Sequence, residues 1–192
     1  ELTSHGHDVI VQSTAGLGIN VSDKQYEAAG AKIVPSIENV YAKADMIVKV
    51  KEPQPLECKL LRKDQILFTY LHLAAEKKLT MALLDSGCTA IAYETVTDAM
   101  GRLPLLAPMS DVAGRMSIQA GAHSLEQPQG GSGVLLGGVP GVEPGRVAVI
   151  GGGVVGTSAI KVALGMGARV TVLDKSLKRL NELENQFGSH LN

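Results

Sequence analysis

A glycine-rich turn is the clearest feature of the sequence that could carry chemistry. The segment Gly151-Gly-Gly-Val-Val-Gly156 follows an apolar run, Val147–Ile150, and leads into a stretch of helix-forming residues. In such a strand–turn–helix unit Gly151 permits a tight turn, Gly153 lets the backbone approach a pyrophosphate, and Gly156 allows close helix packing. N–H groups in the first helical turn then face the phosphates. The residues that we expect to bind a dinucleotide here are Gly151, Gly153, Val154, Val155 and Gly156.

An acidic residue, Asp174, ends the next apolar run, Ala168–Leu173, about 20 residues beyond the turn. A carboxylate at this position accepts hydrogen bonds from the adenosine ribose and repels a 2′-phosphate. The pattern therefore favours NAD over NADP, although three nearby basic residues weaken that preference: Lys175, Lys178 and Arg179.

Two further candidate catalytic residues, Lys51 and His72, follow apolar runs in the first half of the chain. If those runs are parallel strands, both side chains project from the carboxyl edge of one sheet, where ligands bind in open α/β folds. A lysine there can polarise a carbonyl, and a histidine can transfer protons near neutral pH. For either residue alone, a solvated loop lysine or a surface or core histidine is the more common explanation. Because the two residues coincide on one edge, the functional and the ordinary explanations are about equally good. Glu94 occupies a similar position, where a hydrated strand-end carboxylate explains it equally well.

The elements that must position these residues alternate between strands and helices. Such a rhythm predicts parallel sheets covered by helices. Ser22 and Ser36 are expected N-caps, and Gly30 and Gly87 expected C-caps. The strands that we expect in the first half are Val9–Gln12, Ala31–Val34, Met46–Val50, Ile66–Tyr70 and Thr89–Glu94; the helices are Ser22–Gly30, Ser36–Ala44, Leu56–Arg62 and Ala74–Gly87.

The second half begins with an expected loop, Asp98–Pro108, and a long helix, Ser110–Gln127, with Ser110 as its N-cap. Small residues on this helix predict close packing against a neighbour. The run Val134–Leu136 could form one arm of a short hairpin. Beyond it we expect strands at Val147–Ile150 and Ala168–Leu173 and helices at Gly156–Met166 and Leu177–Phe187.

Composition excludes several other classes of protein. The net charge is −1 and no basic block is present, so we expect no nucleic-acid partner. No apolar run is long enough to span a bilayer, and no segment has the pattern of a secretion signal, so we expect a cytoplasmic protein without a membrane partner. Cys58 and Cys88 are expected to be reduced thiols. The remaining histidines have no metal-ligand spacing, so we expect no metal site.

Six segments together resemble bacterial alanine dehydrogenase, in the alanine dehydrogenase/transhydrogenase NAD-subunit family. The resemblance extends over nearly the whole chain. The segments are Asp45-Met-Ile-Val-Lys-Val-Lys-Glu-Pro53, Phe68-Thr-Tyr-Leu-His-Leu-Ala74, Ala90-Ile-Ala-Tyr-Glu-Thr95, Pro108-Met-Ser-Asp-Val-Ala-Gly-Arg115, Leu135-Leu-Gly-Gly-Val-Pro-Gly141 and Ile150-Gly-Gly-Gly-Val-Val-Gly156.

The resemblance implies reversible, NAD-dependent oxidative deamination of L-alanine to pyruvate and ammonia by a homohexamer. It implies that Lys51 binds the substrate, that His72 is the acid/base and also holds substrate, and that Ser110 and Arg179 join the glycine turn and Asp174 in contacting the cofactor. It also implies two Rossmann-like domains: a substrate domain at residues 1–108, a connecting helix at 109–127, and an incomplete NAD-binding domain at 128–192.

The chain also departs from the family pattern. It lacks an initial Arg-Val-Ala-Leu-Thr-Pro segment whose arginine grips the substrate carboxylate, and the family's second domain continues past Asn192. We therefore expect these 192 residues alone not to turn over alanine. Two other interpretations stay open: an NAD-binding subunit of a nicotinamide nucleotide transhydrogenase, which has no need of a substrate-facing Lys51 and His72, and a truncated, non-catalytic remnant.

Overall fold

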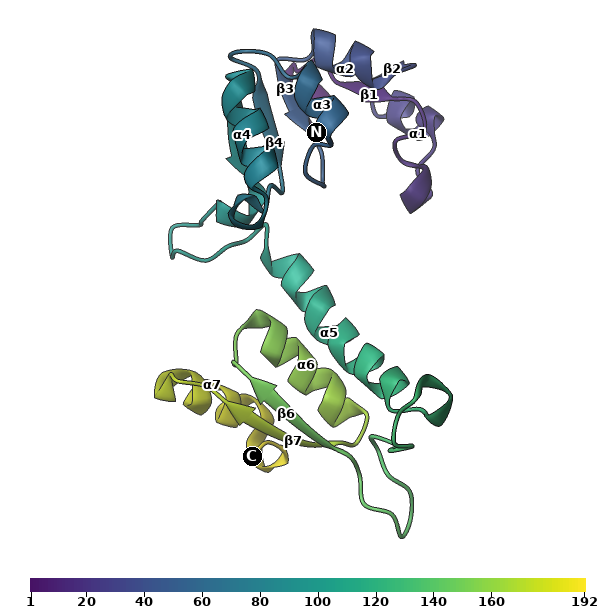
Figure 1. The fold of residues 1–192 in the computed structure, drawn as a ribbon, viewed down its shortest axis with the longest axis vertical. Coiled ribbons are helices and arrows are strands. Elements are labelled where there is room, and N and C mark those ends of the chain that lie inside the picture. The colour runs from purple at the N-terminus through teal and green to yellow at the C-terminus, as the bar shows by residue number, and fades with distance from the viewer. The chain divides into compact units, whose positions relative to one another are not determined.

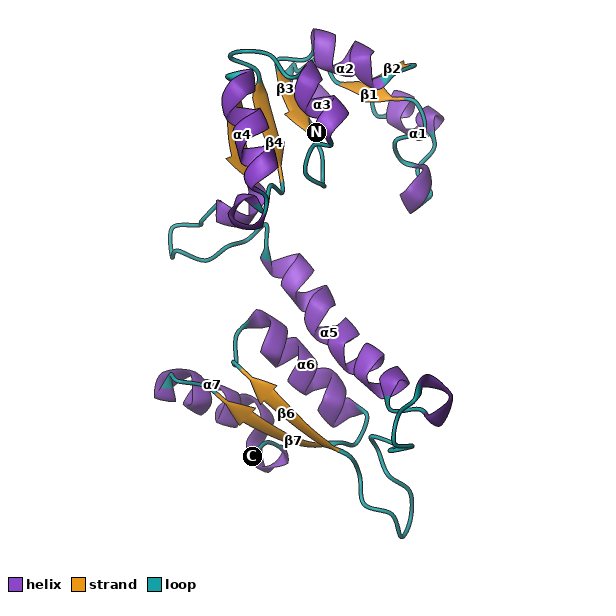
Figure 2. Cartoon of the chain, viewed as in Figure 1, coloured by secondary structure: helices purple, strands orange, loops and turns teal.

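The computed structural model describes residues 1–192, which form two compact units, Glu1–Val96 and Thr97–Asn192. Each unit is a parallel α/β structure, as the alternating pattern predicts (Figures 1 and 2). The fold class expected from the sequence is therefore confirmed. No helix combines the length and the apolar character that crossing a membrane requires.

The first unit contains five short strands, all in parallel pairs. β1 (Ile10–Gln12) pairs with β2 (Lys32–Val34). A second sheet has the order β3-β4-β5, formed by β3 (Met46–Val48), β4 (Ile66–Thr69) and β5 (Thr89–Ala92). Since β3, β4 and β5 are parallel neighbours, the residues that follow them leave from one edge of the sheet.

Four helices connect these strands: α1 (Asp23–Ala28), α2 (Ile37–Lys43), α3 (Pro55–Leu60) and α4 (Lys77–Ser86). Ser36 caps α2 by accepting a hydrogen bond from the Asn39 N–H, and the backbone N–H of Ser22 donates to the Gln25 side chain in the reciprocal bond of a capping box. α4 ends at Gly87, in a left-handed conformation. The buried core of the unit consists of Tyr41, Ile47, Leu61, Leu67, Leu71 and Leu83.

The second unit contains a parallel β–α–β unit. α5 (Ala107–Ser124) runs alongside α6 (Val154–Gly165), which connects β6 (Arg146–Ile150) to β7 (Arg169–Leu173), and α7 (Leu177–Phe187) follows (Figure 1). The backbone of Asn192 exchanges hydrogen bonds with Val170 and Val172, and an isolated parallel bridge joins Leu191 to Val170. This arrangement is part of a Rossmann-like sheet.

The structure corrects two local expectations. Ser110 is not an N-cap, because α5 begins at Ala107 with Pro108 in its first turn, where proline lacks only an N–H that would be unpaired anyway. The Ser110 N–H instead donates to the carbonyl of Leu106. The run Val134–Leu136 is in no strand and so forms no hairpin arm: Leu136 packs into the core, and the antiparallel bridge joins Val139 to Val142.

Close packing of α5 on α6 depends on Gly114. A Cβ atom at this position would lie 2.2 Å from the carbonyl oxygen of Val155 and 2.8 Å from the Cβ of Ser158. Ser158 also donates a hydrogen bond to Asp111. The helix that the sequence suggests as a connector thus packs directly against the helix that follows the glycine turn.

Candidate functional site

The three motif glycines of the second unit meet three different steric requirements. Gly151 has φ +94° and donates its N–H to the Leu173 carbonyl, which links the turn to β7. A Cβ atom on Gly156 would lie 1.9 Å from the Gly151 carbonyl oxygen, so only glycine fits there. A Cβ atom on Gly153 would meet nothing within 4 Å. The open space at Gly153 is what the close approach of a ligand to the backbone needs.

Asp174 closes the turn from the end of β7. One carboxylate oxygen accepts the Gly152 N–H at 2.7 Å, and the other accepts the Ser176 N–H at 2.8 Å. The bond from Gly152 and then the bond from Ser176 have the largest effects on the pKa of the Asp174 carboxyl, and they lower it below its usual value despite desolvation. The charges of Arg179 and Lys175 lower this pKa further. The acid is therefore ionised at neutral pH and already oriented toward the turn.

Arg179, a residue of α7, binds the glycine turn with its side chain. Its Nε donates to the Gly152 carbonyl at 2.6 Å, and its Nη2 donates to Thr157 Oγ1 at 2.7 Å. Thr157 in turn donates to the Gly153 carbonyl at 2.7 Å. The guanidinium is thus held at the N-terminus of α6, where its charge adds to that of the helix dipole. Thr157 was not among the residues predicted from the sequence, although it directly follows the motif in the first turn of α6.

A cleft of about 890 Å³ opens beside the turn within the second unit. Its walls come from β6, the start of α6, α5 and the loop that precedes α5. Six residues predicted to contact the cofactor line it: Ser110, Gly151, Gly153, Val154, Val155 and Gly156. Asp174 and Arg179 do not line the cleft; both are hydrogen-bonded to Gly152, which stands between the lining residues Gly151 and Gly153.

In the first unit, Glu52 brings Lys51 and His72 together at the predicted sheet edge. Glu52 Oε2 lies 3.9 Å from Lys51 Nζ and 3.6 Å from His72 Nδ1. This oxygen is buried and accepts no hydrogen bond, so both contacts are ion pairs. The contact with His72 is an ion pair only when the imidazole is protonated. Glu52 was not among the residues predicted from the sequence, although it directly follows Lys51.

The charge of Glu52 is maintained by its surroundings. The hydrogen bond of its own backbone N–H lowers the pKa of the Glu52 carboxyl, and the charges of Lys51 and His72 lower it further, against the opposing effect of burial. A carboxylate between a lysine and a histidine can orient the imidazole through Nδ1. Nε2 then remains for a substrate.

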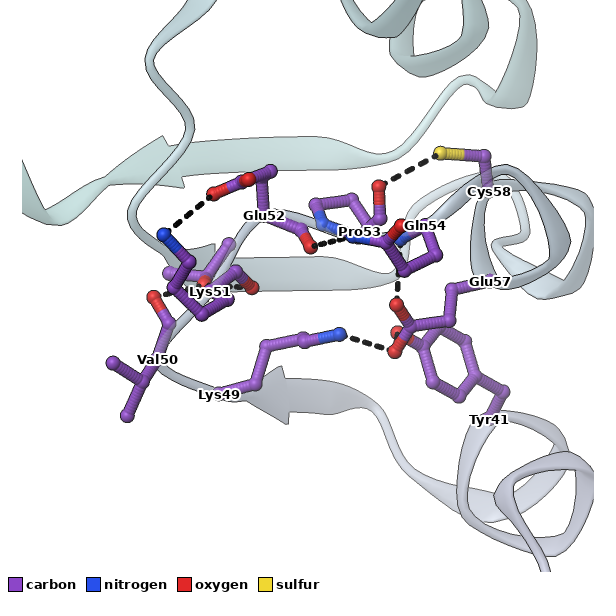
Figure 3. A network of polar contacts seen from close by, with 10 residues as sticks. Tyr41, Lys49, Val50, Lys51, Glu52, Pro53, Gln54, Glu57 and Cys58 are labelled. Carbon is purple, nitrogen blue, oxygen red and sulfur yellow. Dashed lines mark hydrogen bonds and ion pairs between the residues drawn. The ribbon is translucent and has the colours of Figure 1, made fainter.

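A buried ion pair supports the loop that carries Lys51 and Glu52. The Glu57 carboxylate accepts hydrogen bonds from Lys49 Nζ, from the Tyr41 hydroxyl at 3.2 Å and from the Gln54 N–H at 2.6 Å. Figure 3 shows Lys49, directly after β3, and Tyr41, on α2, pointing toward this carboxylate. The segment that carries Lys51 and Glu52 is therefore fixed at both ends: it begins at the end of β3, and it ends at Gln54, which is bound to Glu57.

Burial and the charge of Glu57 also affect two neighbouring groups. Burial raises the pKa of the Tyr41 hydroxyl, and Glu57 raises it further. The same two causes raise the pKa of the Cys58 thiol. Cys58 and Cys88 are both free thiols.

A second set of bonds joins the ends of β3 and β4. Thr69 Oγ1 donates to the carbonyls of Val50 and Lys51, at 3.0 and 2.9 Å, and the Tyr70 N–H donates to Val50. The His72 ring stacks on Tyr70 with a centroid separation of 6.1 Å. These contacts fix where Lys51 and His72 leave the sheet.

Comparison with known proteins matches both halves of the chain to one family. The model described as "Alanine dehydrogenase/PNT, N-terminal domain" matches residues 1–113, and the corresponding C-terminal domain model matches residues 117–192.

The chain belongs to the alanine dehydrogenase/PNT family.

The similar proteins include alanine dehydrogenases and a transhydrogenase. A curated alanine dehydrogenase from Halomonas elongata is 61% identical over 97% of this chain and 50% of its own length. A solved L-alanine dehydrogenase has a TM-score of 0.91 at 54% identity, and this chain covers 53% of it. A transhydrogenase from Sinorhizobium meliloti has a TM-score of 0.78 at 25% identity, and 56% of it is covered. The chain thus spans about half the length of the curated relatives it matches.

Proposed function

We propose that this chain carries the substrate-side residues and the first part of the nucleotide site of an NAD-dependent alanine dehydrogenase. The observation that carries the proposal is the pair Lys51 and His72, joined through Glu52 at one sheet edge, in a chain that is 61% identical to an enzyme of that name. The balanced reaction converts L-alanine, NAD⁺ and water to pyruvate, ammonium, NADH and a proton.

Several residues of the second unit fit a dinucleotide. The open space at Gly153 and the close helix approach at Gly156 suit a pyrophosphate at the N-terminus of α6. Ser110, Gly151, Val154, Val155 and Arg179 are the other residues that we propose hold it, and Asp174 is the proposed ribose ligand and the reason for NAD rather than NADP. The dinucleotide, when bound, supplies the hydride acceptor.

The residues of the first unit supply binding and proton transfer. Lys51 Nζ binds the substrate carboxyl and polarises the carbonyl that forms when the C–N bond breaks. His72 Nε2 takes a proton from the attacking water as the carbinolamine forms and returns it to the departing amine. Glu52 Oε2, 3.6 Å from Nδ1, stabilises the imidazolium that exists between these two proton transfers.

The wider properties of the enzyme follow from the same family membership. We propose that the complete protein is a cytoplasmic homohexamer that acts in amino-acid catabolism. We also propose a substrate domain at residues 1–108, a connecting helix at 109–127 and the first part of the NAD-binding domain at 128–192. These 192 residues alone are proposed to be inactive.

A chimaera tests the proposed activity. The chain is joined to the segments of the Halomonas elongata enzyme that it does not cover, and NADH formation from L-alanine is measured. We expect alanine-dependent activity that falls roughly 100-fold or more in His72→Ala and persists in His7→Ala, which removes an exposed histidine. An inactive but folded chimaera, or an unimpaired His72→Ala variant, would contradict the proposal.

The transhydrogenase alternative has a specific observation in its favour, the TM-score of 0.78 to a transhydrogenase. It predicts that the chimaera passes hydride from NADH to a second oxidised nucleotide without alanine. Because that reaction has no amine or carbonyl substrate, activity that is insensitive to His72→Ala would favour it. A chimaera that binds NADH without either turnover would favour the non-catalytic interpretation.

A further inference from the structure

The turn that carries His72 is bound to a carboxylate from the neighbouring strand. Glu94 follows β5 and lies in a short 3₁₀ turn, Tyr93–Thr95. Glu94 Oε1 accepts the backbone N–H of His72 at 2.7 Å and that of Leu71 at 3.2 Å, and Oε2 lies 3.3 Å from the Leu71 nitrogen. Two successive backbone donors therefore converge on one carboxylate.

The backbone at His72 needs such support. His72 has φ +50° and ψ +37°, the left-handed conformation, which residues with a Cβ atom seldom adopt. A conformation of this kind persists only where the surrounding structure holds it. On one side Leu71 is buried in the core, and on the other Glu94 binds both N–H groups.

The charge state of Glu94 suits this role. Burial alone raises the pKa of its carboxyl, but the hydrogen bonds from its own N–H and from those of His72 and Leu71 outweigh burial, so the pKa is lowered. Glu94 is therefore an ionised acceptor at neutral pH. Backbone N–H bonds to a carboxylate are stronger than those between neutral groups.

We propose that Glu94 is a positioning residue for His72. It fixes the backbone of the turn, while Glu52 and Tyr70 orient the ring, so that the imidazole leaves the sheet in one direction. The effect of Glu94 on the backbone is independent of the reaction. Its effect on catalysis rests on the proposed function.

Hydrogen exchange of single amides in the 192-residue chain tests the backbone role. We compare the chain with Glu94→Ala, Glu94→Gln and a matched control, Asp85→Ala, which removes an exposed carboxylate from α4. The Leu71 and His72 amides should exchange at least roughly 10-fold faster in Glu94→Ala, and less so in Glu94→Gln, which keeps one oxygen acceptor. The Tyr70 amide, which donates to Val50 instead, should change little.

The exchange data separate this role from general instability. Unchanged Leu71 and His72 amides in Glu94→Ala would overturn the proposal. Equal acceleration of these two amides and of the β4 amides in both Glu94 variants would also overturn it, because Glu94 would then stabilise the whole unit and not the turn.

The chimaera described above tests the catalytic consequence. Glu94→Ala should lower kcat roughly 100-fold through misplacement of the imidazole, with NADH affinity unchanged and partial recovery in Glu94→Gln. Wild-type kcat in Glu94→Ala would overturn the positioning role. If the parent chimaera had no alanine-dependent activity, the proposed function would fail while the exchange result on Glu94 stood.

Discussion

The backbone N–H of Gly152 donates a hydrogen bond of 2.7 Å to Asp174, which joins the middle of the glycine turn to the end of β7. The same carboxylate is the proposed ribose ligand. Asp174 thus has a structural task in the turn besides the one that the sequence pattern predicts. Changing this residue to alter cofactor preference should also loosen the turn.

The first prediction concerns the pH dependence of stability. The pKa of Asp174 is lowered in the folded chain, so its contribution is complete above its ordinary value of 3.8 and is lost as the pH falls through the folded-state value. Asp174→Asn should therefore lower the melting temperature at about pH 7, and the difference from wild type should shrink at about pH 3. A difference that is equal at both pH values would contradict this assignment.

The second prediction uses two glycines of one turn. Gly156→Ala places a Cβ atom 1.9 Å from the Gly151 carbonyl oxygen, so we expect a loss of about 1–3 kcal/mol in unfolding free energy. Gly153→Ala meets open space and should leave stability nearly unchanged, yet weaken NADH binding at least roughly 10-fold by blocking the pyrophosphate. Urea unfolding and NADH titration distinguish the two effects, and equal NADH affinity in Gly153→Ala would contradict the proposed phosphate site.

The third prediction concerns the contact between α5 and α6. Gly114→Ala should destabilise the second unit by about 1–3 kcal/mol, because the new Cβ atom would lie 2.2 Å from the Val155 carbonyl oxygen. Gly121→Ala, on the same helix, meets nothing within 4 Å and should stabilise it by about 0.5–1 kcal/mol. Thermal unfolding of both variants provides the test, and a shift of the same sign in each would refute the steric argument.

The fourth prediction concerns the buried pair beneath the substrate-side loop. Lys49→Met leaves the Glu57 carboxylate buried without its cation and should cost about 3 kcal/mol of unfolding free energy. Adding Glu57→Gln removes the unpaired charge and should recover part of the loss.

The exposed pair of Lys32 and Asp8 supplies the control for this prediction. Lys32→Met should change stability little, because exposed ion pairs contribute little. Equal effects of Lys49→Met and Lys32→Met in urea unfolding would show that burial does not determine the strength of the Lys49–Glu57 pair.

The sequence by itself determined the order of strands and helices and the glycine turn, and it predicted that Lys51 and His72 would share an edge if their strands were parallel. These features depend on neighbouring residues: apolar runs between helix-forming segments, caps such as Ser36, and glycines where the backbone needs them. The start of α5 was predicted wrongly because two local signals for a helix N-terminus lie close together. Ser110 has the chemistry of an N-cap, but Pro108 suits the first turn better and α5 begins before it.

Only the tertiary structure decided which side chains meet. The bonds from Glu94 to the His72 turn and from Asp174 to Gly152 join residues about 20 positions apart, across parallel strands connected by a helix. Which strand ends lie next to each other depends on sheet register and on helix packing, and no short segment of sequence determines either. For the same reason Glu52, adjacent to Lys51 in the sequence, could be identified as the link to His72 only after β3 and β4 were placed side by side.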